Sequence, residues 1–207
     1  MRHLFFPALL ALLAAGTAHA APQVYRIDPV HSSVVFNVDH NGFSRSFGRL
    51  RITDGSVNFD PDNWPASSVN ATIDLASVDM GDSEWDKAVR GSNLLDADRE
   101  RSARFTSDAV EKRSDDEGVL HGKLTLRGVT MPLDIPFRVN RVGKTIYGLH
   151  TIAGFSANIV LDRTKFGMTA NTGSIGTQVS VWLEIEAIRG GESPASHDKE
   201  TPDARAQ

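Results

Sequence analysis

The sequence of 207 residues contains no cysteine, which excludes disulfide bonds, thiol catalysis and metal sites built on thiolates. It also lacks a basic run: 22 lysines and arginines stand against 26 acidic residues, and the formal net charge is −4. Such a mildly acidic chain is a poor candidate for binding nucleic acid, because nucleic acids are held mainly through their phosphates. No apolar run approaches the ~20 residues that a membrane-spanning helix needs.

The two ends of the chain differ in composition from the rest. Residues 4–15 are apolar, follow Arg2 and His3, and precede Ala18-His19-Ala20. This pattern is typical of a secretory signal, so residues 1–20 are predicted to be a signal peptide that is cleaved after Ala20. Removing it leaves 207 − 20 = 187 residues, enough for one domain, which is predicted at residues 22–189. Residues 190–207 contain no Val, Ile, Leu, Met or aromatic residue and are predicted to form a disordered polar tail.

The motifs that would indicate catalysis or a metal site are missing. There is no Gly-x-Ser-x-Gly elbow, no phosphate-binding loop, no GxGxxG and no HExxH. The histidines are scattered singly, and His31 and His40 bracket one predicted strand at nearly opposite ends, so they are not expected to share a metal ion. His40 is interpreted either as a hydrogen-bonded rim residue or as a contact to a ligand head group. Arg163 is interpreted either as half of a surface ion pair or as a partner of a polar head group.

Alternation of apolar and polar residues is the main pattern in the sequence. Residues 119–139 are predicted to form two strands that reverse at Arg127-Gly128, where glycine permits a positive φ. The same period of two recurs at 33–38, 49–52, 69–75, 155–161 and 178–187. Pro132 and Pro136 share the polar parity of their strand and predict a bulge or an unpaired edge. A sheet with one apolar side hides that side by closing into a barrel.

One segment, residues 82–95, departs from this alternation. Asp82 and Ser83 are candidate N-caps, and Trp85, Ala88 and Val89 have helical spacing. We expect one short helix here, or two, lying over a barrel opening or against its wall.

These motifs together resemble the YceI-like family of secreted bacterial proteins. No single motif is specific, but their order and spacing agree over nearly the whole predicted domain. The matching stretches are YRIDP at 25–29, HS at 31–32, HNGFS at 40–44, SVD at 77–79, ARFTS at 103–107, GKLTLRGVT at 122–130, GFSA at 154–157 and FG at 166–167, together with Arg163.

The resemblance implies an all-β, lipocalin-like antiparallel β-barrel with one or two short helices near an opening. It further implies a periplasmic binding or carrier protein that holds an isoprenoid lipid, of the ubiquinone or polyprenol type, in an apolar tunnel. No cofactor is expected besides such a lipid or quinone as ligand, no metal, and no enzymatic activity. Two alternatives stay open: a quinone-handling accessory to a membrane cytochrome, and a hydrolase or isomerase acting on small amphiphiles. A homodimer is compatible with all three.

The residues expected to line the tunnel are those of apolar parity in the predicted strands, with His40 at one end. Each of them is also compatible with ordinary core packing. They are Val34, Phe36, Val38, His40, Leu50, Ile52, Val57, Phe59, Ile73, Phe105, Leu124, Leu126, Leu133, Ile135, Phe155, Ile159, Val181 and Leu183.

Overall fold

The structure, a computed structural model, describes residues 22–146 and 149–190. The predicted signal peptide, and the predicted tail apart from its first residue, lie outside the described residues. The described elements are mostly strands, with one α-helix and two short 3-10 helices. In chain order they are β1 (Gln23–Ile27), β2 (Ser33–His40), β3 (Ser44–Phe59), η1 (Trp64–Ala66), β4 (Ser68–Asp79), α1 (Ser83–Arg90), β5 (Ser102–Lys112), β6 (Glu117–Leu126), β7 (Val129–Lys144), β8 (Thr151–Asp162), η2 (Arg163–Phe166) and β9 (Ile175–Arg189).

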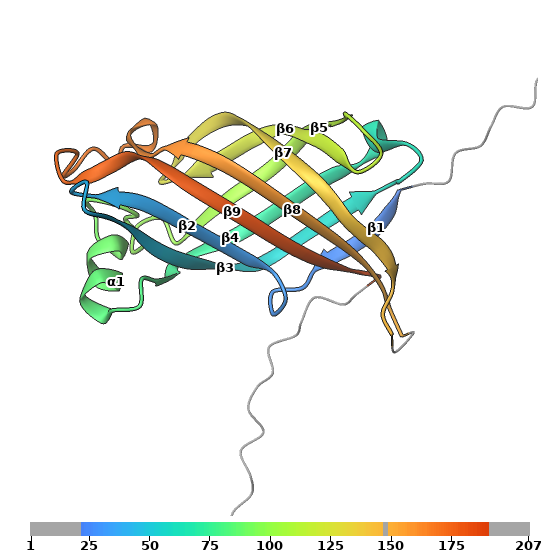
Figure 1. Ribbon diagram of the computed structural model, residues 1–207, viewed down its shortest axis with the longest axis horizontal. Coiled ribbons are helices and arrows are strands. Elements are labelled where there is room, and N and C mark those ends of the chain that lie inside the picture. The colour runs from blue at the N-terminus through green and yellow to red at the C-terminus, as the bar shows by residue number, and fades with distance from the viewer. Residues whose placement is uncertain (1–21, 147–148, 191–207) are drawn as a thin grey trace, which may run out of the picture.

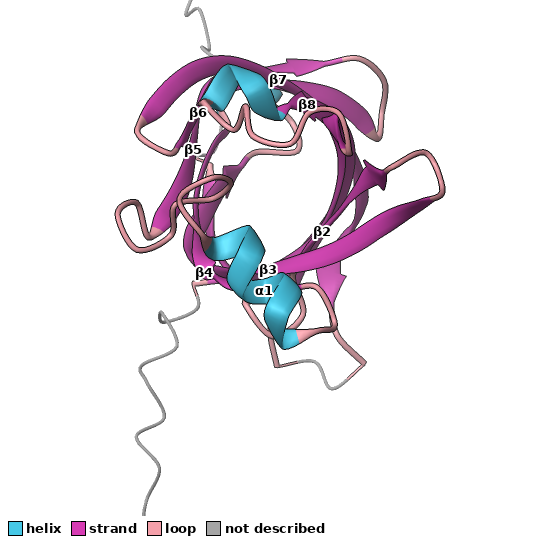
Figure 2. Cartoon of the chain, turned by 90° about the vertical axis from the view of Figure 1, so that its left-hand side faces the viewer, coloured by secondary structure: helices cyan, strands magenta, loops and turns pink. Residues whose placement is uncertain are grey.

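The strands form one antiparallel sheet that closes on itself as a ring (Figures 1 and 2). Around the ring the order is β3-β2-β9-β8-β7-β6-β5-β4, and β4 pairs back with β3. The short β1 pairs with β3 and β9, the same two strands that flank β2, so β1 and β2 share one of eight positions. The prediction of an all-β, lipocalin-like antiparallel barrel is therefore confirmed.

The hairpin of β6 and β7 has the turn that its sequence predicts. Arg127 and Gly128 adopt φ values of 52° and 72°, and Leu126 pairs with Val129 on either side of them. Two consecutive residues with positive φ match the right-handed twist of the two strands. This turn fixes the register, which places the apolar parity of both strands inside the ring.

The two prolines of β7 lie where the strand has only one neighbour. Pro132 and Pro136 face Lys123 and Val119 of β6, whereas pairing between β7 and β8 begins at Phe137. The first half of β7 therefore has a free edge toward β8, and a missing N–H costs no ladder hydrogen bond there. The expectation of an unpaired edge is confirmed; the register shift in β7 lies farther along the strand, beyond Val139.

The helical segment forms one helix, α1, at one end of the barrel (Figures 1 and 2). The Asp82 carboxylate caps it by accepting hydrogen bonds from the amides of Glu84 and Trp85, both 3.1 Å long. The helix ends before Gly91, and the second helix that the sequence allowed does not form, because residues 92–95 are turns. In the described part of the chain, no helix is both long and apolar enough to cross a membrane.

The opposite end of the barrel is filled by aromatic side chains. Phe59 at the end of β3 and Trp64 of η1 have ring centroids 5.6 Å apart. Phe137 stacks on Trp64 at 5.6 Å, and Phe155 meets Phe59 edge-on at 5.5 Å. All four side chains are buried, so this aromatic cluster forms the floor of the interior, and α1 borders the other end.

Candidate functional site

The interior of the barrel contains a cavity of about 360 Å³ at the end that carries α1. Its wall is almost wholly apolar, and its few polar lining residues are Asp39, His40, Ser46 and Arg163. Fourteen of the predicted tunnel residues line it: Val34, Phe36, Val38, His40, Leu50, Ile73, Phe105, Leu124, Leu126, Leu133, Ile135, Ile159, Val181 and Leu183.

A second cavity, of about 120 Å³, lies between the first one and the aromatic floor. The remaining predicted tunnel residues, Ile52, Val57, Phe59 and Phe155, line this deeper space. The two cavities are neighbours, since five of the predicted residues line both: Val34, Ile73, Phe105, Ile135 and Leu183. The alternation pattern thus located every predicted residue on the inner face, in two spaces rather than one tunnel.

The predicted set omitted side chains of the wall from the helix, from the loops and from some strands. Trp85, Ala88 and Val89 of α1 line the larger cavity, and so do Met168 of the loop after η2 and Ile175 at the start of β9. The omitted strand residues include Leu75, Ala103, Leu161 and Val179. The helical spacing of the three α1 residues was visible in the sequence and indicated an apolar helix side. Met168 stands outside the alternation, where no periodic signal identifies the buried side, whereas Ile175 shares the parity of Val179 and Val181 and could have been found from it.

The mouth of the larger cavity lies beside α1. Trp85 lines the cavity and is also exposed, so the cavity reaches the surface there. The ring of His40 lies 5.6 Å from the ring of Trp85, and His40 Nε2 is 3.3 Å from the side-chain amide nitrogen of Asn41. His40 therefore has the position expected of a rim residue: it lines the cavity, and Asn41 is its hydrogen-bond partner.

Arg163 is not the surface residue that its charge suggested. Its side chain is 3 % exposed, and no carboxylate pairs with it among the described residues. Instead, Nε donates to the carbonyl of Gly176 at 2.8 Å, Nη2 to that of Ile175 at 2.8 Å, and Nη1 to those of Ala170, at 3.0 Å, and Met168. Burial lowers the pKa of this guanidinium below its usual range. The surface ion pair is thus wrong: Arg163 ties the loop after η2 to the start of β9.

Two of the other histidines, His31 and His121, lie on the outer surface, away from the cavity. His31 Nδ1 is 2.8 Å from the Asp28 carboxylate, which raises the pKa of His31. His121 lies between Asp134 and Glu111, at 2.8 and 3.3 Å. Within residues 22–146 and 149–190, no group of three or more His, Asp or Glu side chains is arranged to hold a metal ion.

The YceI-like domain family matches residues 25–187 of this sequence. The chain belongs to the YceI-like family. A UPF0312 protein of Shewanella putrefaciens is 33 % identical over 180 residues, covering 87 % of this chain and 94 % of the relative. A UPF0312 protein of Serratia proteamaculans is 34 % identical over 180 residues, covering 86 % of this chain and 92 % of its own length.

Solved structures share the barrel of this YceI-like chain. Burkholderia cenocepacia BcnA matches with a TM-score of 0.71 at 23 % identity, over 78 % of this chain and 99 % of that one. A polyisoprenoid binding domain from Saccharophagus degradans matches with a TM-score of 0.62 at 15 % identity, over 81 % of this chain and 99 % of that one. At such identities the likeness shows the fold.

Proposed function

We propose that this YceI-like protein is a binding or carrier protein that holds an isoprenoid lipid in its apolar cavities. The observation that carries this proposal is the larger cavity, which opens beside α1 and is lined by apolar side chains with a few polar groups. Its 360 Å³ falls in the range of roughly 300–1,000 Å³ that is common for small-molecule sites. The description of the S. degradans domain as polyisoprenoid-binding supports the same ligand class.

The physical chemistry of the wall suits an isoprenoid tail. Such a tail offers apolar surface and no hydrogen bonds, and the inner face leaves no buried side-chain polar atom without a partner among the described residues. Burying ~600 Å² of tail at ~25 cal/mol per Å² stabilises the complex by about 15 kcal/mol before ordering costs are subtracted. Because methyl groups contribute nearly alike, selectivity for one tail over another is expected to be modest.

A hydrolase or isomerase would require polar groups grouped in the interior. The polar side chains that line the larger cavity are instead few: Asp39, His40, Ser46 and Arg163. The guanidinium of Arg163 already donates to four main-chain carbonyls, and this leaves little capacity for chemistry. This distribution favours binding over catalysis.

The proposal also includes the location of the protein in the cell and the head group of the bound lipid. A signal peptide at residues 1–20 would place the protein in the periplasm, and a quinone or a polyprenol head group would then lie near His40 and Trp85 at the mouth. A quinone ligand would make a membrane cytochrome a suitable acceptor, whereas a polyprenol would point to a carrier role without electron transfer.

The test is native mass spectrometry of protein purified from cells without detergent, followed by lipid extraction. A bound species of several hundred daltons that fragments as an isoprenoid is the expected result, and its head group separates quinone from polyprenol. Ala103→Trp directs an indole into the larger cavity and should abolish the bound species, whereas Thr106→Trp, which faces outward on the same strand, should keep it. Bare protein that also takes up neither added ubiquinone nor added polyprenol would refute the proposal.

A further inference from the structure

The two cavities of the barrel meet at a waist, formed by the five side chains that line both of them: Val34, Ile73, Phe105, Ile135 and Leu183. The largest of these side chains, Phe105, packs directly on the main chain of β6. A Cβ atom at Gly122 would lie 2.7 Å from Phe105 Cζ, so the ring can lie this close to the wall only because position 122 has no side chain. The waist therefore narrows the interior, while the two cavities remain neighbours.

The aromatic floor is packed against β6 in the same way. Gly118 is buried on the same inner side of β6 as Gly122. A Cβ atom at Gly118 would lie 2.7 Å from Trp64 Cζ3 and 2.9 Å from Phe137 Cε1, so these two rings rest on the strand itself. Phe137 also lines the deeper cavity, together with Phe59 and Phe155. The floor is thus the end of the space that a ligand tail can enter.

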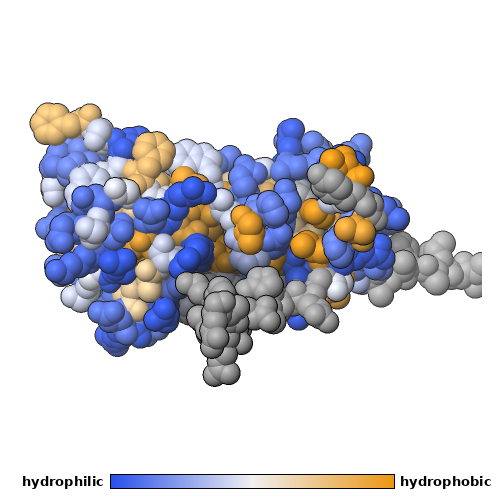
Figure 3. Space-filling view, turned by 90° about the horizontal axis from the view of Figure 1, so that it is seen from below, coloured by the Kyte–Doolittle hydropathy of each residue, from blue (hydrophilic) through white to orange (hydrophobic). Residues whose placement is uncertain are grey.

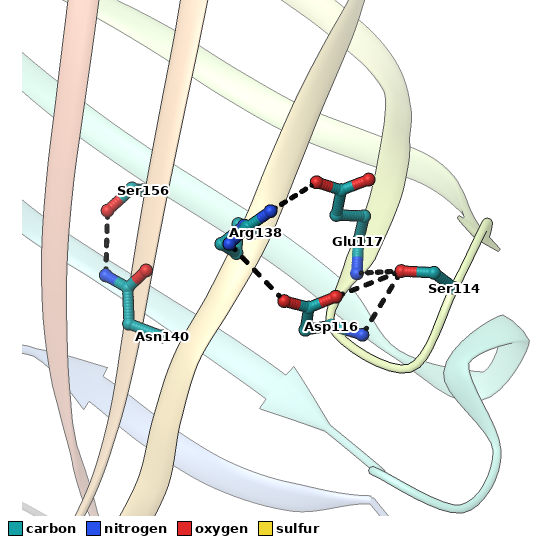
Figure 4. Close-up of polar contacts among 6 residues, drawn as sticks. All are labelled: Ser114, Asp116, Glu117, Arg138, Asn140 and Ser156. Carbon is teal, nitrogen blue, oxygen red and sulfur yellow. Dashed lines mark hydrogen bonds and ion pairs between the residues drawn. The ribbon is translucent and has the colours of Figure 1, made fainter.

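Polar contacts on the outer face join the strands at the level of the floor (Figure 4). Arg138, next to Phe137 in β7, pairs with Glu117 of β6 at 2.7 Å. Asn140 donates a hydrogen bond of 2.7 Å to Ser156 and so links β7 to β8. Each exposed contact contributes little alone, but the main-chain pairing of β7 with β8 also lies in this half of β7. We therefore expect the floor to stay closed when a ligand is bound.

The volumes of the two cavities set the length of tail that the barrel holds. They measure about 360 and 120 Å³. A dry apolar cavity of ~150 Å³ holds one benzene molecule, which corresponds to ~25 Å³ per carbon atom. On that scale the larger cavity holds about 14 carbons and the deeper one about five, which is one isoprene unit. Together they hold a tail of close to four units.

We propose that the barrel selects isoprenoids by tail length, and that the deeper cavity takes the last unit of a tail of about four isoprene units. The inference rests on the proposed function and narrows its ligand class to short-tailed isoprenoids. The aromatic floor sets the limit, because a longer tail must leave its remaining units outside the mouth.

Units outside the mouth lose their hydrocarbon surroundings. On the face drawn in Figure 3, the apolar side chains of the surface are interrupted by hydrophilic ones, so such units would lie partly against polar groups and water. In a bilayer the same units lie wholly in hydrocarbon. Since each methylene exposed to water costs about fourfold in affinity, isoprenoids above the limit favour the bilayer over the protein.

The test is an uptake experiment with a ladder of tail lengths. Purified protein is incubated with phosphatidylcholine vesicles that contain equal amounts of isoprenoid alcohols with two, three, four, five, six and eight units. It is then separated from the vesicles, and native mass spectrometry measures each bound alcohol. We expect uptake of tails of up to four units, and uptake of the six-unit alcohol at least about 1,000-fold below that of the four-unit one.

Two variants should move the limit in opposite directions. Ala157 lines the deeper cavity and not the larger one, so Ala157→Leu leaves too little space there for one unit and should lower the limit to three units. Phe155→Ala removes a phenyl ring from the floor, which frees space for about one more unit and should raise the limit to five. Such a gain cannot result from partial unfolding. Ala109→Leu makes the first substitution at an exposed position of β5 and should leave the limit at four.

The outcomes separate tail selection from isoprenoid binding itself. Equal uptake of the four-, six- and eight-unit alcohols would overturn the length limit and leave isoprenoid binding intact. A limit that neither Ala157→Leu nor Phe155→Ala moves, in variants that circular dichroism shows to be folded, would overturn the role of the floor. Uptake of none of the alcohols would refute the proposed function, and tail selection with it.

Discussion

Replacing the buried Arg163 should destabilise the barrel far more than replacing any exposed arginine. Arg163→Met keeps an unbranched side chain of similar length but removes all donors from the carbonyls of Met168, Ala170, Ile175 and Gly176. At ~1 kcal/mol for each lost hydrogen bond, the free energy of unfolding should fall by about 4 kcal/mol. In a domain of this size that corresponds to a melting temperature lower by roughly 8–16 °C.

Urea unfolding followed by circular dichroism measures this loss directly. Arg163→Lys keeps the charge without the fork of donors and should recover less than half of the stability, because an ammonium cannot serve carbonyls on both sides of the loop. Arg104→Met, on the outer face of β5, is the control and should change the free energy of unfolding by about 0.5 kcal/mol or less. A loss below about 1 kcal/mol for Arg163→Met would show that these four hydrogen bonds do not hold the loop.

Two further predictions concern the strands. Gly122→Ala places a Cβ 2.4 Å from the carbonyl oxygen of Thr106 and should cost roughly 1–3 kcal/mol in urea unfolding, whereas Gly154→Ala, with no atom nearer than 3.8 Å, should be nearly neutral. The carboxylate of Asp134 raises the pKa of His121, so the pair favours the folded state below the unfolded pKa of ~6.5 and loses this effect as pH rises through the raised value. An NMR titration should show the pKa of His121 falling in Asp134→Asn; an unchanged value would assign the shift to other groups.

Period-two alternation predicted the barrel well, because the apolar residues that point inward both form the core and line the cavities. Leu124 and Val181 were located on the inner face from parity alone, and both line the larger cavity. The turn at Arg127-Gly128 was equally visible, since glycine after a strand indicates a reversal. Parity shows that a residue points inward but not how far along the barrel axis it lies. It therefore did not separate Phe155, which lines the deeper cavity, from Leu124, which lines the larger one.

The sequence misled where a side chain acts through main-chain atoms. The four carbonyls that bind Arg163 belong to residues of the loop and the start of β9, and carbonyls have no signature in a sequence. An arginine after a strand therefore suggested a surface ion pair, although the chain buries it. The stacked rings of Phe47 and Trp182 escaped notice for a similar reason: the two residues are 135 positions apart in the sequence, and only the order of β3, β2 and β9 brings them together.

The buried arginine after β8 acts where the ring of strands is interrupted. The first half of β7, which carries Pro132 and Pro136, does not pair with β8, so strand hydrogen bonds do not close the wall there. Phe166 and Met168, from η2 and the loop after it, pack into the cluster that contains Ile135 of β7. Arg163 anchors this loop through the carbonyl of Met168, so its hydrogen bonds hold an apolar cover where the ring is interrupted. Loss of Arg163 should therefore destabilise the fold and also loosen the cavity wall. We expect a variant that lacks Arg163 to be less stable and to retain a bound ligand less well.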